Sequence, residues 1–314
     1  MPTKKPKNIT RSTRHVAGII PVANLKTDYD STMPAVLYPY AAGGGYVYSF
    51  IQKAVLECAL AGCRTIWIVA NDDLAPIIRH TVGDYVFDPV WAFRKRTWAH
   101  SELRREVPIY YLPIHMKHKD RLDSNGWSAL HGITMASWIT RKISKWIVAD
   151  KFYVTFPLSV YDFNEVRKHR DSIRDEKNFS LTYKGKTVKD NIPLPFTLTF
   201  KDHRNCRVNI QQSTTREYAP PADPSAIPDV RLSKEDQWSA RHFDLDEVYA
   251  PLDMSDVFKA ELPWFYDARE WHQYCDYLGN EGKLMRYPTK FLTRTHKHSK
   301  IAFDELEKQH EGEE

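Results

Sequence analysis

The first residues that could do chemistry lie in a short polar loop behind an apolar run. The run extends from Val16 to Val22, and the loop continues as Ala23, Asn24, Leu25, Lys26 and Thr27. A run of this kind is typical of a buried parallel strand, and the loop at the carboxyl end of such a strand often binds phosphate. No glycine occurs between Gly18 and Gly43, so the loop lacks the residue that lets backbone approach a phosphate closely. The ammonium group of Lys26 could replace part of that binding.

A glycine-rich stretch follows at residues 41–49, AAGGGYVYS. It precedes a predicted helix, and a helix N-terminus favours anions, so it could be a relocated phosphate loop. A flexible turn at Gly43 to Gly45 explains the same residues equally well.

Three further groups of side chains have both a functional and a structural interpretation. His115, His118 and His131 could bind a metal, but zinc ligands are normally grouped more tightly, which favours a polar rim. Basic and aromatic residues alternate over 91–105, as on surfaces that bind single-stranded nucleic acid, although a solvated helix explains them as well. The aromatic residues of 264–277 could stack on a sugar or base, but core packing is the commoner role.

The predicted elements place the first loop at a sheet edge. A helical pattern at residues 48–61 ends at Gly62, and a second buried strand follows at 64–70. Because the connection between parallel strands is right-handed, the loop after the first strand lies at the carboxyl edge, where open α/β folds bind ligands. A helix at 72–83, a strand at 107–114, a helix at 126–143 and an apolar strand over 145–162, with a break allowed at 149–151, continue the alternation. We therefore predict an α/β fold with a doubly wound, mainly parallel sheet and helices on both faces.

The pattern changes near residue 172. Alternating apolar and polar residues around Lys184-Gly185 predict an antiparallel β insertion over about 172–230, which ends in a proline-rich connector. From Leu245 the sequence again favours helices. We expect a basic tail at 1–14, one domain over 15–280, and a helical extension with a charged tail at 281–314.

These segments resemble a known family. Residues 15–84, including AGCRTIWIV and VGD, are similar in order and spacing to the N-terminal half of the sugar-phosphate nucleotidyltransferases, whose fold is shared with nucleotide-sugar glycosyltransferases of the GT-A type. Those enzymes join a nucleoside triphosphate to a sugar 1-phosphate and release pyrophosphate. SNGWSALHGITMA is similar to the stretch that opens a helix beside the base, with Gly126 and Ala129 in matching places. LPWFYDAREW resembles the motif around a metal-binding aspartate, which implies Asp267. The resemblance covers about residues 15–280.

The resemblance implies a set of binding and catalytic residues. A nucleotide would lie against Ala23 to Thr27, Gly126 and Ala129, and Lys26 would steady a phosphate. Asp162 and Asp267 would hold Mg²⁺, which offsets triphosphate charge and orients the attack.

The sequence departs from the family at the charged positions. Lys26 stands where the family has a glycine, and Asp28 stands where it has an arginine. Ala35 follows Pro34 in place of a lysine. Pro157 and Leu158 occupy the Gly-Asp position of the first metal aspartate, so only Asp162, further along, could substitute.

Composition excludes several classes of protein. The 314 residues are 42% hydrophobic, which suffices for a large core. The four cysteines show no CxxC pair, which favours free thiols in a reducing compartment. We find no apolar stretch long enough for a membrane span or signal sequence, no P-loop motif and no nucleophile elbow, and we expect a cytoplasmic protein.

Two hypotheses remain. In the first, the protein binds a nucleoside triphosphate or nucleotide-sugar and transfers a nucleotidyl group to a sugar phosphate. In the second, it is an inactive binding or assembly module, with nucleic acid contacting the basic tail and residues 94–105.

Overall fold

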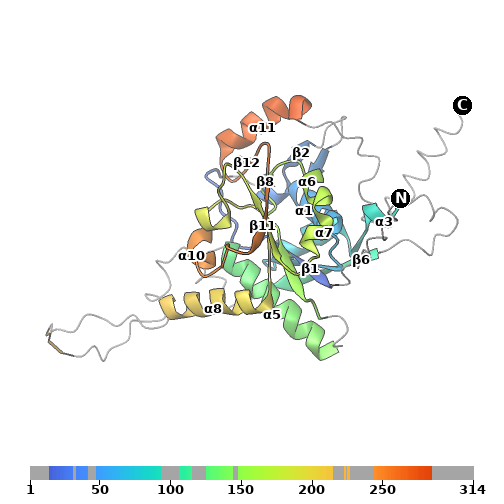
Figure 1. The fold of residues 1–314 in the computed structure, drawn as a ribbon. Helices are drawn as coiled ribbons and strands as arrows, with labels where there is room; N and C mark the ends of the chain where they lie inside the picture. Colours follow the sequence, from blue (N-terminus) through green and yellow to red (C-terminus); the bar gives the residue numbers. More distant parts are fainter. Residues whose placement is uncertain are drawn as a thin grey trace, which may run out of the picture.

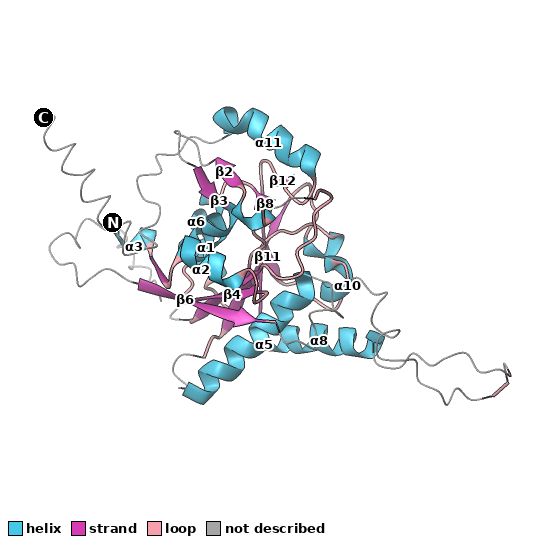
Figure 2. Cartoon of the chain, turned by 180° about the vertical axis from the view of Figure 1, so that it is seen from behind, coloured by secondary structure: helices cyan, strands magenta, loops and turns pink. Residues whose placement is uncertain are grey.

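The computed structural model describes residues 14–30, 33–41, 47–92, 106–114, 125–143, 148–214, 223, 225–226 and 243–284. Its centre is an eight-stranded sheet with helices on both faces (Figures 1 and 2). The strands, in spatial order, are β11 (Val257–Glu261), β9 (Asn178–Thr182), β10 (Phe196–Leu198), β7 (Lys151–Val154), β1 (Val16–Pro21), β4 (Thr65–Ala70), β6 (Glu106–Pro113) and β5 (Tyr85–Phe87). The predicted α/β class is confirmed.

Four neighbouring strands, β7, β1, β4 and β6, run parallel to one another. The chain moves outward from β1 to β4 and β6, and then returns to place β7 on the other side of β1. The order therefore reverses between β1 and β7, which is the position where open α/β sheets bind ligands beyond their carboxyl ends.

Each face of the sheet has its own core. On one face lie α1 (Phe50–Ala61), α2 (Ala75–Val82), α6 (Asn164–Lys168) and α7 (Arg170–Ile173), and on the other α5 (Asn125–Ile143), α8 (Phe200–Thr214) and α10 (Leu245–Tyr249). A third cluster packs α11 (Trp271–Leu284) against two small antiparallel sheets, β2 (Pro39–Ala41) with β3 (Val47–Ser49) and β8 (Ser159–Val160) with β12 (Tyr266–Asp267). The short elements η1 (Ala35–Leu37), α3 (Pro89–Ala92) and η5 (Val188–Asp190) complete the fold.

Glycines let a helix approach the sheet closely on each face. A Cβ at Gly18 in β1 would lie 2.7 Å from Sγ of Cys58 in α1. A Cβ at Gly132 in α5 would lie 2.6 Å from Cγ2 of Val69 in β4. Side chains at these two positions would push the layers apart, because packed interiors have no spare volume.

Local signals account for the best-predicted elements. Ser49 caps α1 by accepting from the backbone N–H of Gln52 at 3.3 Å, and Gly62 ends the helix with φ +87°. The tight turn at Lys184-Gly185 is present, since both residues have positive φ and Tyr183 pairs with Lys186.

Two regions differ from the sequence prediction. β9 and β10 pair antiparallel as expected, and β10 also pairs with β7, so these strands extend the central sheet; within the predicted β-rich region, however, Phe200–Thr214 forms the helix α8. Residues after Leu245 do not form only helices: β11 pairs with β9 and β12 pairs with β8. In both regions the strands form by pairing with segments far away in the sequence, which a local pattern does not reveal. In the region after Leu245, the aromatic residues had suggested helices instead.

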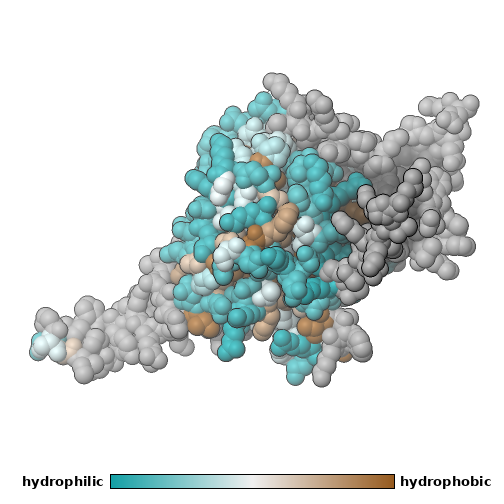
Figure 3. All heavy atoms as spheres, in the orientation of Figure 1, coloured by the Kyte–Doolittle hydropathy of each residue, from teal (hydrophilic) through white to brown (hydrophobic). Residues whose placement is uncertain are grey.

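Most of the surface seen in Figure 3 is hydrophilic, with hydrophobic residues in small groups. Among the described helices, none is long and apolar enough to span a membrane. The cysteines Cys58, Cys63, Cys206 and Cys275 are free thiols, as predicted.

Candidate functional site

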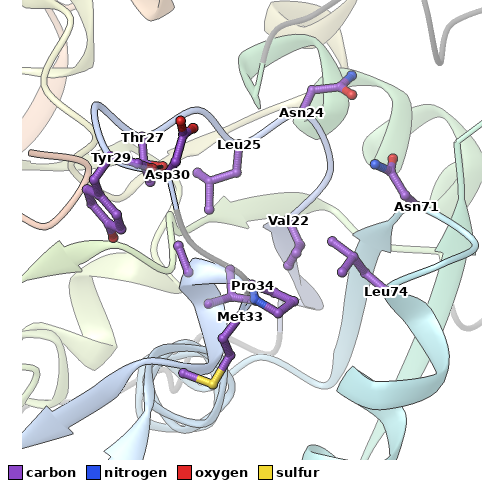
Figure 4. Close-up of a pocket in the computed structure, with 12 residues that line it drawn as sticks. Val22, Asn24, Leu25, Thr27, Tyr29, Asp30, Met33, Pro34, Asn71 and Leu74 are labelled. Atoms are coloured by element: carbon purple, nitrogen blue, oxygen red, sulfur yellow. Dashed lines mark hydrogen bonds between the residues drawn. The ribbon is translucent and has the colours of Figure 1, made fainter.

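A pocket of about 510 Å³ lies at the carboxyl ends of β1 and β4 (Figure 4). The loop after β1 forms one wall, the segment leading into η1 forms the floor, and the start of α2 closes the other side. Its lining residues are Val22, Asn24, Leu25, Thr27, Tyr29, Asp30, Met33, Pro34, Ala35, Val36, Asn71 and Leu74. The pocket thus adjoins the position where the strand order reverses, and its volume is typical of small-molecule sites.

Asn24 makes the turn that a glycine makes in many phosphate loops. Its φ is +57°, in the left-handed region that asparagine tolerates better than other residues with a side chain. The preceding backbone is fixed, because the N–H groups of Val22 and Ala23 both donate to the carbonyl of Val69, at 2.8 and 2.9 Å. The loop therefore keeps a glycine-like path and adds an amide side chain at its bend.

The pocket is polar without being basic. Among its twelve lining residues, Asp30 is the charged one, and Asn24, Thr27 and Asn71 provide uncharged polar groups. Oδ1 of Asn71 is buried and has no hydrogen-bond partner among the described residues. A buried acceptor of this kind is costly unless a ligand or water satisfies it. The lining suits an uncharged group with hydrogen-bond donors better than a phosphate.

The outer part of the β1 loop is held by the segment between β12 and α11. The N–H of Asp28 donates to the carbonyl of Arg269 at 3.0 Å, and the N–H of Trp271 donates to Oδ1 of Asp28 at 2.8 Å. The hydroxyl of Tyr29 donates to the carbonyl of Ala268 at 3.1 Å. Burial raises the pKa of Tyr29 far above its ordinary value, so it remains a donor. These bonds connect the pocket to the surroundings of Asp267.

Asp267 is engaged by a guanidinium. Nη2 of Arg269 lies 2.6 Å from Oδ2 of Asp267, and Nε lies 3.0 and 2.9 Å from the two carboxylate oxygens. The backbone N–H of Arg269 also donates to Oδ1 of Asp267, at 3.0 Å. The Asp267 side chain is only 9% exposed.

Asp162 has a different environment. Its Oδ1 accepts from the backbone N–H and from Nδ2 of Asn164, both at 2.9 Å. Asn164 is the first residue of α6. Asp162 also helps to raise the pKa of the buried Tyr40, after the larger effect of burial. The carboxylates of Asp162 and Asp267 thus bind different partners.

The predicted magnesium site does not fit this arrangement. Mg²⁺ held by both aspartates would have to displace Arg269 from Asp267 and Asn164 from Asp162. Within the described ranges, no cluster of three or more histidine, cysteine, aspartate or glutamate side chains could hold a metal ion. The carboxylates of Asp162 and Asp267, as they are bonded, do not fit a shared magnesium ion.

The other predicted binding residues lie at different depths. Asn24, Leu25 and Thr27 line the pocket, and Lys26 is exposed on the same loop. Ala23 is buried, and its carbonyl accepts from Oγ of Ser128 at 3.0 Å and Nδ2 of Asn125 at 3.3 Å. The sequence interpretation missed these two α5 side chains, which fix the start of the loop by hydrogen bonds to the carbonyl of Ala23.

Gly126 and Ala129 lie in the packed layer behind the loop. Val248 of α10 covers Gly126, since a Cβ there would lie 3.1 Å from Cγ2 of Val248. Ala129 is completely buried in the core between α5 and the sheet. The nucleotide contacts predicted for these two residues remain predictions.

A buried ionic network under the site also escaped the sequence interpretation. Nζ of Lys53 lies 2.7 Å from Oε2 of Glu57 and donates to the carbonyl of Ser159 at 2.8 Å, and both charged side chains are completely buried. The hydroxyl of Tyr153 donates to Oε1 of Glu57 at 2.6 Å. Burial lowers the pKa of Lys53. The network joins α1 to β7 and to β8, the strand that pairs with the segment containing Asp267.

Several predicted features lie outside the described residues. These are the glycine stretch at 42–46, the basic segment at 93–105, His115 and His118, the first thirteen residues of the basic tail, and the tail beyond 284. His131 is described, and its ring lies 3.3 Å from the carbonyl of Pro113.

Comparison with known proteins gives structural likeness alone. No family model and no curated protein matches the sequence. A structure described as a glucose-1-phosphate thymidylyltransferase from Bacillus anthracis, in complex with a sucrose, has a TM-score of 0.48 and 12% identity over 88% of this chain and 98% of its own. The inositol-1-phosphate CTP transferase of T. maritima has a TM-score of 0.47 and 9% identity over 84% and 92% of the two chains. A UDP-glucose pyrophosphorylase complexed with UDP-glucose has a TM-score of 0.49 and 11% identity over 86% and 99%. In fold, this chain is similar to these sugar-phosphate nucleotidyltransferases.

Proposed function

We propose that the protein binds a nucleotide or nucleotide-sugar, with the base in the pocket between the ends of β1 and β4. The observation that carries this proposal is the amide of Asn71, which lines that pocket and whose Oδ1 is buried without a hydrogen-bond partner among the described residues. The Asn24 side chain extends from the neighbouring strand end on the same side of the pocket (Figure 4). Amide groups of this kind match the adjacent donors and acceptors on the edge of a base.

The rest of the lining supports an uncharged ring in the pocket. Val22, Leu25 and Leu74 offer apolar contacts, and Asp30 can accept from an amino group or a hydroxyl. A phosphate inside the pocket would meet Asp30 without a lining cation, and like charges repel. The phosphates would therefore lie outside it, toward Lys26 and the β7 side of the edge.

The reaction proposed for this site is the one that the sequence resemblance implies. An oxygen of a sugar 1-phosphate would attack the α-phosphorus of a nucleoside triphosphate, the bond to the bridging oxygen would break, and pyrophosphate would leave. The pocket geometry supports the binding step, and a pyrophosphate assay must decide the transfer step.

The binding proposal is tested by calorimetric titration with the common nucleosides, their diphosphates and UDP-glucose. We expect at least one base to bind, and Asn71→Ala to weaken its binding about tenfold, since one hydrogen bond to a buried acceptor is lost. Asn205→Ala, at an exposed position of α8, is the matched control and should bind like the wild type. Equal affinity of Asn71→Ala and wild type would place the base elsewhere.

The transfer proposal is tested with nucleoside triphosphates and sugar 1-phosphates. Pyrophosphate release that requires both substrates is the expected result. A protein that binds nucleotides but releases no pyrophosphate from any pair would be a binding module.

A further inference from the structure

The carboxylate predicted to hold magnesium already holds a cation that belongs to the chain. Nε and Nη2 of Arg269 face the carboxylate of Asp267 in a two-point ion pair, and Nη2 also donates to the carbonyl of Asn191 at 3.2 Å. This geometry is the strongest that arginine forms with a carboxylate, and it fixes the plane of the guanidinium. The Arg269 side chain is 28% exposed. Among the described residues, only Nε and Nη2 of this guanidinium form hydrogen bonds, so the donors of Nη1 can serve a ligand.

The ion pair lies at the same sheet edge as the pocket, on the other side of β1. The N–H of Ala268 donates to the carbonyl of Leu158 at 2.9 Å, just beyond the carboxyl end of β7. Tyr29, which lines the pocket, donates its hydroxyl to the carbonyl of Ala268 at 3.1 Å, so the segment that carries Asp267 and Arg269 borders the pocket.

We propose that Arg269 is the phosphate-binding residue of the nucleotide site and that it acts in place of a divalent metal ion. Asp267 is a positioning residue, which orients the guanidinium without contacting the ligand. This inference rests on the proposed nucleotide binding. It assigns the phosphate contact to Arg269, in the turn after β12, and it predicts that nucleotide binding does not depend on added metal.

Charge explains why the same place cannot serve arginine and magnesium together. A guanidinium within hydrogen-bond distance of Asp267 would repel a dication at that carboxylate, and Mg²⁺ also demands oxygen ligands in regular geometry. Asp267 forms a two-point pair at low exposure, so its negative charge is already balanced. A phosphate, in contrast, gains charge-assisted hydrogen bonds from the exposed part of the same guanidinium.

The experiment compares nucleosides with nucleoside diphosphates by calorimetric titration, in EDTA and in Mg²⁺. For wild-type protein, the diphosphate of the preferred base should bind at least tenfold more tightly than the nucleoside, to the same extent in both buffers. Arg269→Gln should lose this phosphate increment while nucleoside affinity stays within twofold. Asp267→Asn should lose part of the increment, and Arg269→Lys should recover part of what Arg269→Gln loses.

Arg79→Gln is the matched control, because Arg79 forms the same kind of two-point pair with Asp84 at an exposed position of α2. It should bind both ligands like the wild type. Diphosphate binding that EDTA abolishes, or an unchanged increment in Arg269→Gln, overturns this inference and leaves the proposed function intact. Failure of every nucleoside and diphosphate to bind overturns the proposed function, and this inference with it.

Discussion

The two sides of the carboxyl edge treat charge in opposite ways. Beyond β1 and β4, the pocket offers two amides, two hydroxyls, the carboxylate of Asp30 and apolar groups, and one buried acceptor has no partner among the described residues. Beyond β7 lie two ion pairs, Asp267 with Arg269 and Lys53 with Glu57, whereas Asp162 accepts from the backbone and side-chain amides of Asn164. One side therefore has unused hydrogen-bonding capacity, whereas the other has balanced its charges within the fold.

We interpret the β4 side as the part that binds the ligand and the β7 side as the part that stabilises the fold. An unsatisfied polar group in a pocket costs stability and is useful only when a ligand arrives. A buried ion pair with complete hydrogen bonding contributes little net stability, yet breaking one half of it is costly. Variants on the β7 side should thus change folding most, and variants on the β4 side should change binding most.

The largest effect is expected from breaking the Lys53–Glu57 pair. Lys53→Met leaves Glu57 charged and buried, so we expect a loss of about 3–5 kcal/mol in the free energy of unfolding. The double variant Lys53→Met/Glu57→Gln removes both charges and should recover more than half of that loss, because Tyr153 can still donate to the amide oxygen. Urea unfolding of the three proteins measures both values. A double variant less stable than Lys53→Met would show that the two residues do not act as a pair.

The next effect concerns a further buried charge on β7, at its other end. Nζ of Lys151 donates to the carbonyls of Ile173, Asp175 and Lys177, and burial lowers its pKa from 10.5 to about 8. Between pH 8 and 10.5 the unfolded chain binds more protons than the folded one, so stability should rise with pH across this window.

The contribution of Lys151 should amount to about 3 kcal/mol at most, by the usual conversion of a pKa difference. Urea unfolding of wild type and Lys151→Met at pH 7.5, 9 and 10.5 measures it as the change in their difference. A difference that stays constant with pH would mean that Lys151 titrates normally in the folded protein.

The sequence predicted elements with local signals and missed features that depend on distant partners. The apolar runs of β1 and β4 and the glycine that ends α1 are local signals, so they were found. β11 and β12 form only because β9 and β8 pair with them, and no local pattern reports that. The same limit applies to Lys53 and Glu57, whose helix gave no sign of the carbonyl and hydroxyl that meet them.

Parts of the site were within reach of sequence reasoning. Asn71 directly follows β4, and polar residues behind a buried parallel strand lie at the ligand edge. Asp267 and Arg269 are two residues apart, at the end of β12 and in the turn that follows it, so an ion pair between them was open to sequence reasoning. The prediction that Asp267 binds magnesium did not take Arg269 into account. The bend at Asn24 could not be read, because a positive φ at asparagine depends on the bonds that hold the loop.

A stability measurement on Asn71 sharpens the contrast with the β7 side. Asn71→Leu replaces a partly unsatisfied amide by an apolar side chain of similar size, so the ligand-free protein should keep its stability or gain up to about 1 kcal/mol. Thermal unfolding without ligand measures this change. A loss above 1 kcal/mol would indicate that hydrogen bonds of the Asn71 side chain stabilise the fold. It would contradict the proposal that residues on the β4 side serve binding and not folding.

A similarly small effect is expected at Asn24, the residue that stands where a phosphate loop has a glycine. With φ at +57°, a residue with an ordinary side chain is strained, so Asn24→Ala should cost about 1 kcal/mol of folding stability. Asn24→Gly keeps the backbone path without strain and should be as stable as wild type. If the amide serves the ligand, however, both variants should bind the nucleotide more weakly, by a similar factor. Asn24→Gly would then have the backbone of a glycine-containing phosphate loop and still bind the nucleotide less tightly than the wild type. The reason is that the side chain at the bend, and not the backbone, contacts the ligand in this pocket. Wild-type affinity in Asn24→Gly would assign Asn24 to the turn alone and leave Asn71 as the recognition residue of the β4 side.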